Sequence, residues 1–405
     1  MNADADGAET LVIPDEDRYH RQALIPWWDQ GRVAGARVLV VGAGALGNEI
    51  LKLLALTGIG NTLIYDMDTI ELSNLSRTVL FREADQGAPK AAVAAQRMTE
   101  LNPDIKARGH QANVAFAAGL GIFLWADVVI CGLDNRTARL FVNGACARTG
   151  RVWIDGATEN LSGIVRVFDP ARTACYECTM NELDRKLVLQ RRSCARLARD
   201  AAARGQVPTT AVSASLVAAL EVQEAIKVLH GQPTLLGEGI HINGLWGDFS
   251  RVRYQRRPDC PGHEFLGALA PLGRGAADVS LGELLQLAEE KFGEGAVLDL
   301  SRDVILRLNC PACHLTEACG RPVGALREHE AACPNCKVHR IVDITGSVSR
   351  DLGLDLSLTL ADIGVPPFDV VVLRCGLTAQ QAYLLDGDAA AVLGGLRAGF
   401  DPAIS

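Results

Sequence analysis

The sequence lacks long hydrophobic runs and an excess of positive charge. No window approaches the ~18 unbroken apolar residues that a membrane-spanning helix needs, so we expect no contact with a membrane. The first ten residues, MNADADGAET, are acidic and polar, which argues against a secretory or transit signal in them and favours a cytoplasmic location. The net charge is −8, which argues against a nucleic acid as the main partner.

The composition is that of a globular protein. Apolar residues make up 48% of the 405 residues and charged residues 22%, which excludes a disordered, collagen-like or coiled-coil chain. A chain of this length favours two or three domains.

Strand and helix patterns alternate along the first two thirds of the chain. Residues 37–41, RVLVV, form a continuous apolar run that is typical of a strand buried on both faces. Further strands are expected at 61–66, 127–131, 151–155, 164–168, 239–244 and 249–255, and helices at 90–101 and 209–229. The alternation predicts a doubly wound α/β fold with a mainly parallel sheet.

Shifts in composition indicate where the chain divides. Residues 1–36 are expected to form an N-terminal arm, and residues 37–264 the first domain. The stretch 265–278 is rich in glycine, alanine and proline and is the expected linker. Residues 279–405 are then expected to form a second, smaller α+β domain.

Cysteine is abundant, with twelve residues. Disulfides are not expected in a cytoplasmic chain, and cysteine pairs two residues apart indicate zinc. Four groups have ligand-type spacing: Cys175/Cys178, Cys260/His263, Cys310/Cys313 and Cys333/Cys336. The last two groups, separated by nineteen residues, have the spacing of a closed, structural zinc ribbon. Cys319, His314 and His329 are alternative ligands for that site.

A glycine-rich turn follows the first expected strand. Gly42, Gly44 and Gly47 stand between this strand and a helix, where backbone N–H groups and the helix dipole can bind phosphate. Asp66 ends the next strand, nineteen residues after Gly47, where an acid can bond a ribose hydroxyl. This pattern suits NAD, FAD or ATP, and a tight turn without a ligand remains an alternative.

The residues after Asp66 resemble one family. The segment 66–77, DMDTIELSNLSR, resembles the D-x-D…S-N-L-x-R motif of the ubiquitin-activating superfamily, which includes the ThiF-type and molybdopterin-synthase adenylyltransferases. Further motifs of that family follow in the same order: R-Y-H-R-Q at 18–22, G-A-P-K at 87–90, C-G-L-D-N at 131–135, C-Y-E-C at 175–178 and V-Q-E-A-I-K at 222–227. The resemblance covers residues 17–264, and C-G-L-D-N differs in one position from the family's C-x-D-N segment.

The resemblance implies a Rossmann-like adenylation domain that uses ATP and Mg²⁺. Such an enzyme joins a carboxylate to the α-phosphate of ATP and expels pyrophosphate, which requires neutralised phosphate charge and an aligned carboxylate. By resemblance, Asp66 holds the ribose and Asp134 binds Mg²⁺. The residues expected to contact the phosphates are Asn74, Arg77 and Lys90. Asp68 serves either the metal or only the turn.

Two more sites follow from the resemblance. Arg21 would reach into the active site of a second subunit, which implies a homodimer; a solvated surface charge is the alternative. The family closes one tetrahedral zinc site with two C-x-x-C pairs, here Cys175, Cys178, Cys260 and His263. His263 replaces a cysteine in that set, and the alternative is three core cysteines with a surface histidine. With the ribbon, two Zn²⁺ ions per chain are expected.

We expect the chain to adenylate a ubiquitin-like protein with a C-terminal glycine. Cys194, within RRSCAR at 191–196, would then form a thioester, and the protein would pass to a conjugating enzyme. The arginines around Cys194 favour a thiolate, although an inert cysteine in a basic helix is the alternative. A bacterial antiviral conjugation system is one setting for this reaction, suggested by analogy.

Three other functions remain open at this point. The main alternative is a sulfur-carrier protein adenylyltransferase for molybdopterin, thiamine or cysteine synthesis. The others are an enzyme that adenylates a small peptide and a non-enzymatic scaffold with a degenerate site.

Overall fold

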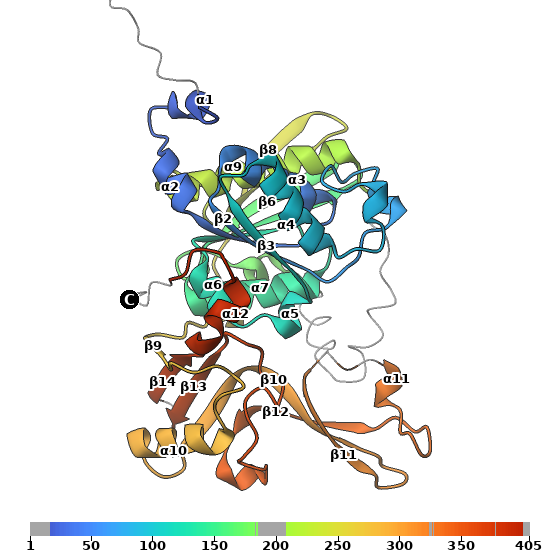
Figure 1. Cartoon of the computed structure of the whole chain (residues 1–405), viewed down its shortest axis with the longest axis vertical. Helices are drawn as coiled ribbons and strands as arrows, with labels where there is room; N and C mark the ends of the chain where they lie inside the picture. The colour runs from blue at the N-terminus through green and yellow to red at the C-terminus, as the bar shows by residue number, and fades with distance from the viewer. Residues whose placement is uncertain are drawn as a thin grey trace, which may run out of the picture.

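The structure, a computed structural model, describes residues 17–182, 184, 208–323, 326, 328–376 and 378–399 (Figure 1). These residues form two sheets with helices packed around them. Among the described residues, no helix has the length and apolar character needed to cross a membrane.

The first sheet has eight strands in the order β3-β2-β1-β4-β5-β6-β7-β8. The parallel strands are β1 (Arg37–Val41), β2 (Asn61–Asp66), β3 (Lys106–Gln111), β4 (Val128–Cys131) and β5 (Trp153–Glu159). The antiparallel strands are β6 (Ser162–Phe168), β7 (Glu238–Asn243) and β8 (Asp248–Arg253). The predicted doubly wound, mainly parallel α/β fold is therefore confirmed.

Side chains of β1 alternate between two hydrophobic cores, as the two-residue period of a strand requires. Val38 and Val40 pack with the helices α3 (Ala45–Thr57), α4 (Lys90–Leu101) and α9 (Ala211–His230). Leu39 and Val41 pack with α6 (Gly121–Trp125) and α7 (Arg136–Thr149) on the other face. Short helices α1 (His20–Ala23), α2 (Gln30–Gly35) and α5 (Val114–Ala117) complete this half.

The second sheet is built from the C-terminal third of the chain. Its strands are β9 (Leu269–Pro271), β10 (Val297–Asn309), β11 (Thr316–Pro322), β12 (Ile341–Val348), β13 (Val370–Cys375) and β14 (Ala379–Leu384). Its helices are α10 (Leu281–Phe292), α11 (Glu328–Ala331) and α12 (Ala389–Leu393). β9 lies within residues 265–278, which were expected to form a linker, and pairs with β14. A strand of three residues can pair through its backbone even where the composition is typical of a linker.

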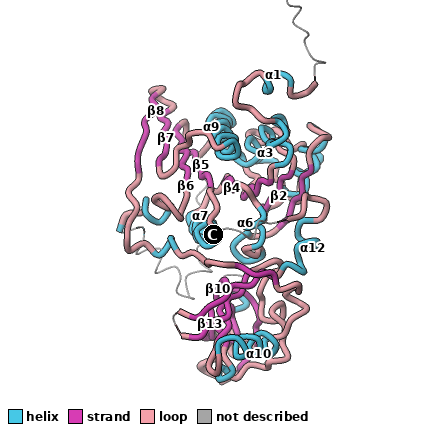
Figure 2. Tube along the Cα trace, turned by 90° about the vertical axis from the view of Figure 1, so that its left-hand side faces the viewer, coloured by secondary structure: helices cyan, strands magenta, loops and turns pink. Residues whose placement is uncertain are grey.

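The two sheets are packed together through the α6/α7 face of the first. Figure 2 shows the layers in order: α3 and α9, the first sheet, α6 and α7, the second sheet, and α10. Phe368 and Leu384 belong to the same hydrophobic core as α6 and α7. The buried Asp369 accepts a hydrogen bond from the Leu120 backbone N–H at 2.8 Å. The second sheet is thus held against the helices that follow β3 and β4.

Candidate nucleotide and metal sites

The glycine-rich turn joins β1 to α3 in a conformation that other residues fit poorly. Gly42 has φ +97°, and a Cβ on it would lie 2.5 Å from the carbonyl oxygen of Gly132. A Cβ on Gly47 would lie 1.9 Å from the carbonyl oxygen of Gly42, so the helix can approach the strand only with glycine there. A Cβ on Gly44 would meet nothing within 4 Å. The turn is therefore open at the N-terminus of α3, where a phosphate can bind.

Asp66 lies against this turn from the end of β2. One carboxylate oxygen accepts a hydrogen bond from the Ala43 N–H at 2.7 Å, and the other accepts from the Asp68 N–H at 2.8 Å. Burial raises the pKa of Asp66, while these two N–H groups and Lys90 oppose that rise. The structure thus brings Asp66 and the turn together, as the sequence predicted.

Lys90, at the start of α4, is paired with Asp68. Its Nζ lies 3.1 Å from Oδ2 of Asp68, and its side chain is 11% exposed. The Lys90 N–H also donates to the Asp68 carbonyl oxygen at 3.1 Å. Asp68 therefore holds Lys90 close to the loop that follows Asp66.

Asn74 and Arg77 lie on the loop between β2 and α4. Asn74 ends a short 3₁₀ helix (Leu72–Asn74), is buried, and accepts a hydrogen bond from the Glu71 N–H at 3.0 Å. Arg77 is half-buried and donates to the Ser73 carbonyl oxygen at 2.7 Å. Asn74 thus has a structural role in this loop, beside the phosphate contact that the sequence predicted for it.

Asp134 lies in the β4–α7 loop, residues 132–135. Its carboxylate is exposed and accepts a hydrogen bond from the Asn135 side chain at 3.2 Å. A Cβ on Gly132 would lie 2.6 Å from the Gly47 backbone nitrogen, so this loop borders the glycine-rich turn. An exposed carboxylate beside a phosphate-binding turn fits Mg²⁺, which prefers a carboxylate oxygen together with phosphate oxygens.

Behind the β4–α7 loop lies a buried group of charged residues that the sequence reasoning missed. Arg139 and Arg166 both donate to Asp155, which is completely buried. Glu221 of α9 is also completely buried. One signal in the sequence was the acid at 155, which ends an otherwise apolar strand pattern.

Arg21 lies near the C-terminal end of α3, whereas the glycine-rich turn lies at the start of that helix. It is exposed on α1, which projects from the body of the molecule in Figure 1. The adjacent Gln22 side chain donates to the carbonyl oxygen of Thr57, the last residue of α3, at 3.3 Å. Since α3 has 13 residues, the arm is about 20 Å from the glycine-rich turn at the start of that helix. The predicted role of Arg21 in the active site of a second subunit stays a prediction.

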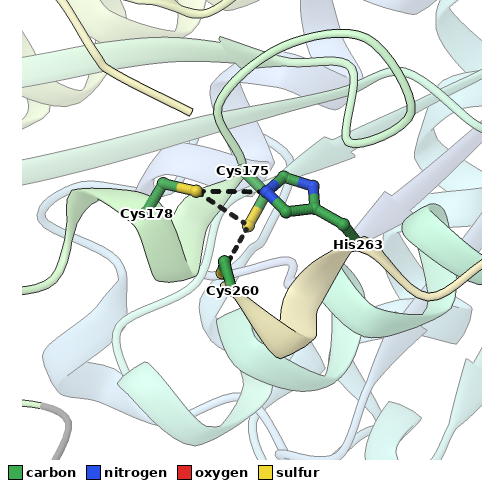
Figure 3. A group of neighbouring side chains, drawn as sticks. All are labelled: Cys175, Cys178, Cys260 and His263. Carbon is green, nitrogen blue, oxygen red and sulfur yellow. Dashed lines mark hydrogen bonds between the residues drawn. The ribbon is translucent and has the colours of Figure 1, made fainter. Parts of the chain in front are cut away.

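The first cysteine-rich cluster is formed by Cys175, Cys178, Cys260 and His263, whose ligand atoms all lie within 4.8 Å of one another. Figure 3 shows the four side chains pointing toward one another. The Sγ atoms of Cys175 and Cys260 are 3.7 Å apart, and His263 Nε2 lies 3.2 Å from the Cys178 Sγ. The structure thus brings together the four residues that the sequence predicted, and this set suits tetrahedral Zn²⁺.

His263 is oriented for a metal by its second ring nitrogen. Its Nδ1 lies 2.7 Å from the Pro170 carbonyl oxygen, which can only accept, so Nδ1 carries the proton. The lone pair of Nε2 is then directed at the thiols. A hydrogen bond from the Cys175 thiol lowers the pKa of Cys178 to about 4, so this cluster readily forms a thiolate.

The second cluster lies at the tip of the second sheet, between two matching turns. Its ligand atoms, the Sγ atoms of Cys310, Cys313, Cys333 and Cys336, also lie within 4.8 Å of one another. The residue after each turn, His314 or Lys337, has a positive φ of 57° or 62°. In both turns its N–H donates to the carbonyl oxygen of the first cysteine at 3.0 Å. The four ribbon cysteines form the group without Cys319, His314 or His329.

Cys194 lies outside the residues that the structure describes. Its predicted role as a nucleophile therefore remains a prediction.

The region that contains the nucleotide site matches known proteins. A model of the ThiF family matches residues 19–262. The "Sulfur carrier protein adenylyltransferase" of Thermus thermophilus is 35% identical over 254 residues, covering 60% of this chain and 89% of that protein. The "Nedd8-activating enzyme E1 catalytic subunit" of Drosophila melanogaster is 40% identical over 158 residues, covering 36% of this chain but only 35% of that protein. The match to "Adenylyltransferase and sulfurtransferase MOCS3" of Mus musculus, at 32% identity, covers 60% of this chain and 51% of that protein.

The same region of the chain also matches a solved structure. The structure of E. coli MccB with ATP is 26% identical, with a TM-score of 0.52, and the match covers 62% of this chain and 75% of that chain. Together with the site geometry, these likenesses support an adenylyltransferase.

Proposed function

Since the chain belongs to the ThiF family, we propose that it uses ATP to adenylate the C-terminal glycine of a ubiquitin-like protein. One observation carries the proposal. The Gly42–Gly47 turn, Asp66 and the Asp134 loop follow the adjacent parallel strands β1, β2 and β4, so they meet at one edge of the sheet. This edge combines an open phosphate-binding turn with an acid for the ribose and an acid for Mg²⁺.

The reaction forms one bond and breaks another. A carboxylate oxygen of the substrate attacks the α-phosphorus of ATP, the bond from that phosphorus to the bridging oxygen breaks, and pyrophosphate leaves. The N–H groups of the turn bind the phosphates, and Lys90 and Arg77 offset their negative charge. Asp134 would hold Mg²⁺, which neutralises further phosphate charge when bound.

The β7–β8 hairpin supports a protein substrate. β8 is an edge strand whose residues are all exposed. The exposed apolar residues of the hairpin include Leu245 at 69% and Trp246 at 75% in its turn, and Phe249 at 59% on β8. Exposed apolar residues beside a strand edge that no other described strand pairs with are typical of a protein-binding face. We assign this face to the ubiquitin-like substrate.

A second step would use Cys194. Its thiolate would attack the carbonyl carbon of the adenylate, form a thioester and release AMP, after which a conjugating enzyme would accept the acyl group. Bacterial antiviral conjugation is one setting for this reaction. We further propose that both cysteine-rich clusters bind a structural Zn²⁺ ion, and that the enzyme is a cytoplasmic homodimer.

The second candidate is a sulfur-carrier adenylyltransferase. It is favoured by the Thermus thermophilus relative, of which the match covers 89%. In that case the adenylate would react with a sulfur donor and yield a thiocarboxylate.

A gel assay separates the two candidates. The enzyme is incubated with ATP and each of a panel of ubiquitin-like and sulfur-carrier proteins that end in glycine, and products are compared with and without thiol. We expect a thiol-sensitive conjugate in the wild type that is lost in Cys194→Ala, whereas the Cys375→Ser control retains it. A conjugate that persists in Cys194→Ala excludes this nucleophile. If no conjugate forms and a sulfide donor instead yields a carrier thiocarboxylate, the sulfur-carrier function is correct.

A further inference from the structure

The β4–α7 loop is fixed on both sides of Asp134. On one side, Gly132 packs against Gly47, and its N–H donates to the Val41 carbonyl oxygen at 2.9 Å. On the other side, the Asn135 side chain caps α7 by accepting from the Ala138 N–H at 2.8 Å. The Asp134 carboxylate itself remains exposed. Its direction therefore depends on the backbone between these two anchors.

Arg139, in the first turn of α7, binds the backbone of this loop. Its Nη2 donates to the Leu133 carbonyl oxygen at 2.5 Å and to the Gly156 carbonyl oxygen at 3.0 Å. Its Nε donates to Oδ1 of Asp155 at 2.6 Å. One guanidinium group thus links the loop to two residues of β5. Only arginine has a rigid fork of donors that can make these three bonds together.

The electrostatics keep Arg139 charged in this position. Its side chain is 8% exposed, and burial alone would lower the pKa of the guanidinium. Asp155 raises that pKa again, and the net effect is a rise above the ordinary value. Arg166 binds the other oxygen of Asp155 at 3.0 Å, but its described hydrogen bonds do not reach the loop. Arg139 and Arg166 therefore share a partner and differ in their contact with the loop.

We propose that Arg139 is a positioning residue, which holds the Leu133–Asp134 backbone so that the Asp134 carboxylate faces the divalent cation of the bound nucleotide. This inference rests on the proposed function, since it assumes nucleotide and cation at this edge of the sheet. It adds to that function a residue that touches neither of them. A partner that orients a metal ligand typically contributes about 10–100-fold to metal affinity.

The test measures how strongly Mn²⁺ tightens the binding of α,β-methylene-ATP to the full chain. Affinity is measured by calorimetry with Mn²⁺ and again with EDTA, and the ratio is compared between variants. We expect Asp134→Ala to remove the tightening, and Arg139→Gln to reduce it about 10–100-fold while affinity in EDTA stays near wild type. Arg139→Lys should fail to restore it, because a single ammonium group keeps the charge but cannot make the three bonds.

Arg166→Gln is the matched control. It removes both hydrogen bonds of Arg166 to Asp155, whereas Arg139→Gln removes one to Asp155 and also the bond to Leu133. Arg166→Gln leaves the loop untouched, so the Mn²⁺ effect should remain. Should Arg139→Gln fold poorly, the double variant Arg139→Gln/Asp155→Asn removes both buried charges and carries the same expectation. The proposal is overturned if these variants keep the wild-type Mn²⁺ effect, or if Arg139→Lys restores it. If wild type does not bind the analogue in EDTA or Mn²⁺, the proposed function itself is wrong.

Discussion

Glu221 is completely buried, and few interactions offset the cost of removing its carboxyl group from water. The Gly156 backbone lies against the carboxyl group, yet neither oxygen has a hydrogen-bond partner of normal geometry among the described residues. Burial is the main cause that raises its pKa well above the ordinary value. In the unfolded chain the Glu221 carboxyl group loses its proton above the ordinary pKa of glutamate, about 4.3. In the folded state the raised pKa keeps the proton bound to a higher pH.

The sign of the pH effect follows from this difference. Because the unfolded state binds fewer protons above about pH 4.3, Glu221 destabilises the fold increasingly as pH rises. Glu221→Gln should then raise Tm at pH 8 by about 1 °C, for roughly 1 kcal/mol in a chain of 405 residues, and by less at pH 5. Calorimetry of both proteins checks this, with the exposed Glu290→Gln as control. An equal gain at both pH values would show that ionisation of Glu221 is not the cause.

Individual site residues were predictable where the chain brings them together locally. Gly42, Gly44 and Gly47 belong to one turn, and Asp66 follows from the end of the next strand. The contact of Arg139 with Asp155 was not predictable, because it needs β5 and α7 to pack side by side. Spacing along the chain does not show which charged residues that packing buries.

At the scale of helices and strands, elements with local sequence signals were predictable, and elements that depend on distant segments were not. The helix predicted at 90–101 is confirmed as α4, since Pro89 fits its start and Asn102-Pro103 ends it. The ribbon turns were predictable from their spacing alone, because each is closed within a few residues. β9 was not, since its pairing with β14 joins segments more than a hundred residues apart.

The two cysteine-rich clusters give a test at this scale. We expect two zinc ions per chain, one for each cluster. Cys260→Ser and Cys313→Ser should each reduce the content to one, and chelation should lower Tm, because structural zinc contributes directly to folding. Mass spectrometry of the purified proteins gives the count. Cys375→Ser, a half-buried cysteine outside both clusters, should retain two. Zinc content unchanged in Cys260→Ser would remove the first site.

At the scale of the whole molecule, the position of Arg21 bears on whether two subunits share an active site. The arm places it about 20 Å from the turn of its own chain, judged by the 13 residues of α3. A complete site would then need the arm of a second subunit. The boundaries predicted at 36, 264 and 278 remain a prediction, and the shared core of the two sheets indicates that the parts depend on each other.

Mixed dimers test this arrangement. Arg21→Ala and Asp134→Ala should each be inactive alone. Co-expressed with different tags, they form mixed dimers, each of which has one intact site of two, so the doubly tagged fraction should recover about half of wild-type activity. The activity of the doubly tagged fraction is measured. No recovery in that fraction would exclude a shared site.

The central claim is that the Gly42–Gly47 edge activates a C-terminal carboxylate with ATP. The most direct measurement is ATP–pyrophosphate exchange with each of a panel of ubiquitin-like proteins that end in glycine. We predict exchange with the cognate ubiquitin-like protein of that panel, none when the terminal glycine of this protein is deleted, and none in Asp134→Ala, whose fold is checked by its Tm. Exchange that persists in Asp134→Ala, or that does not depend on the terminal glycine, would contradict the account.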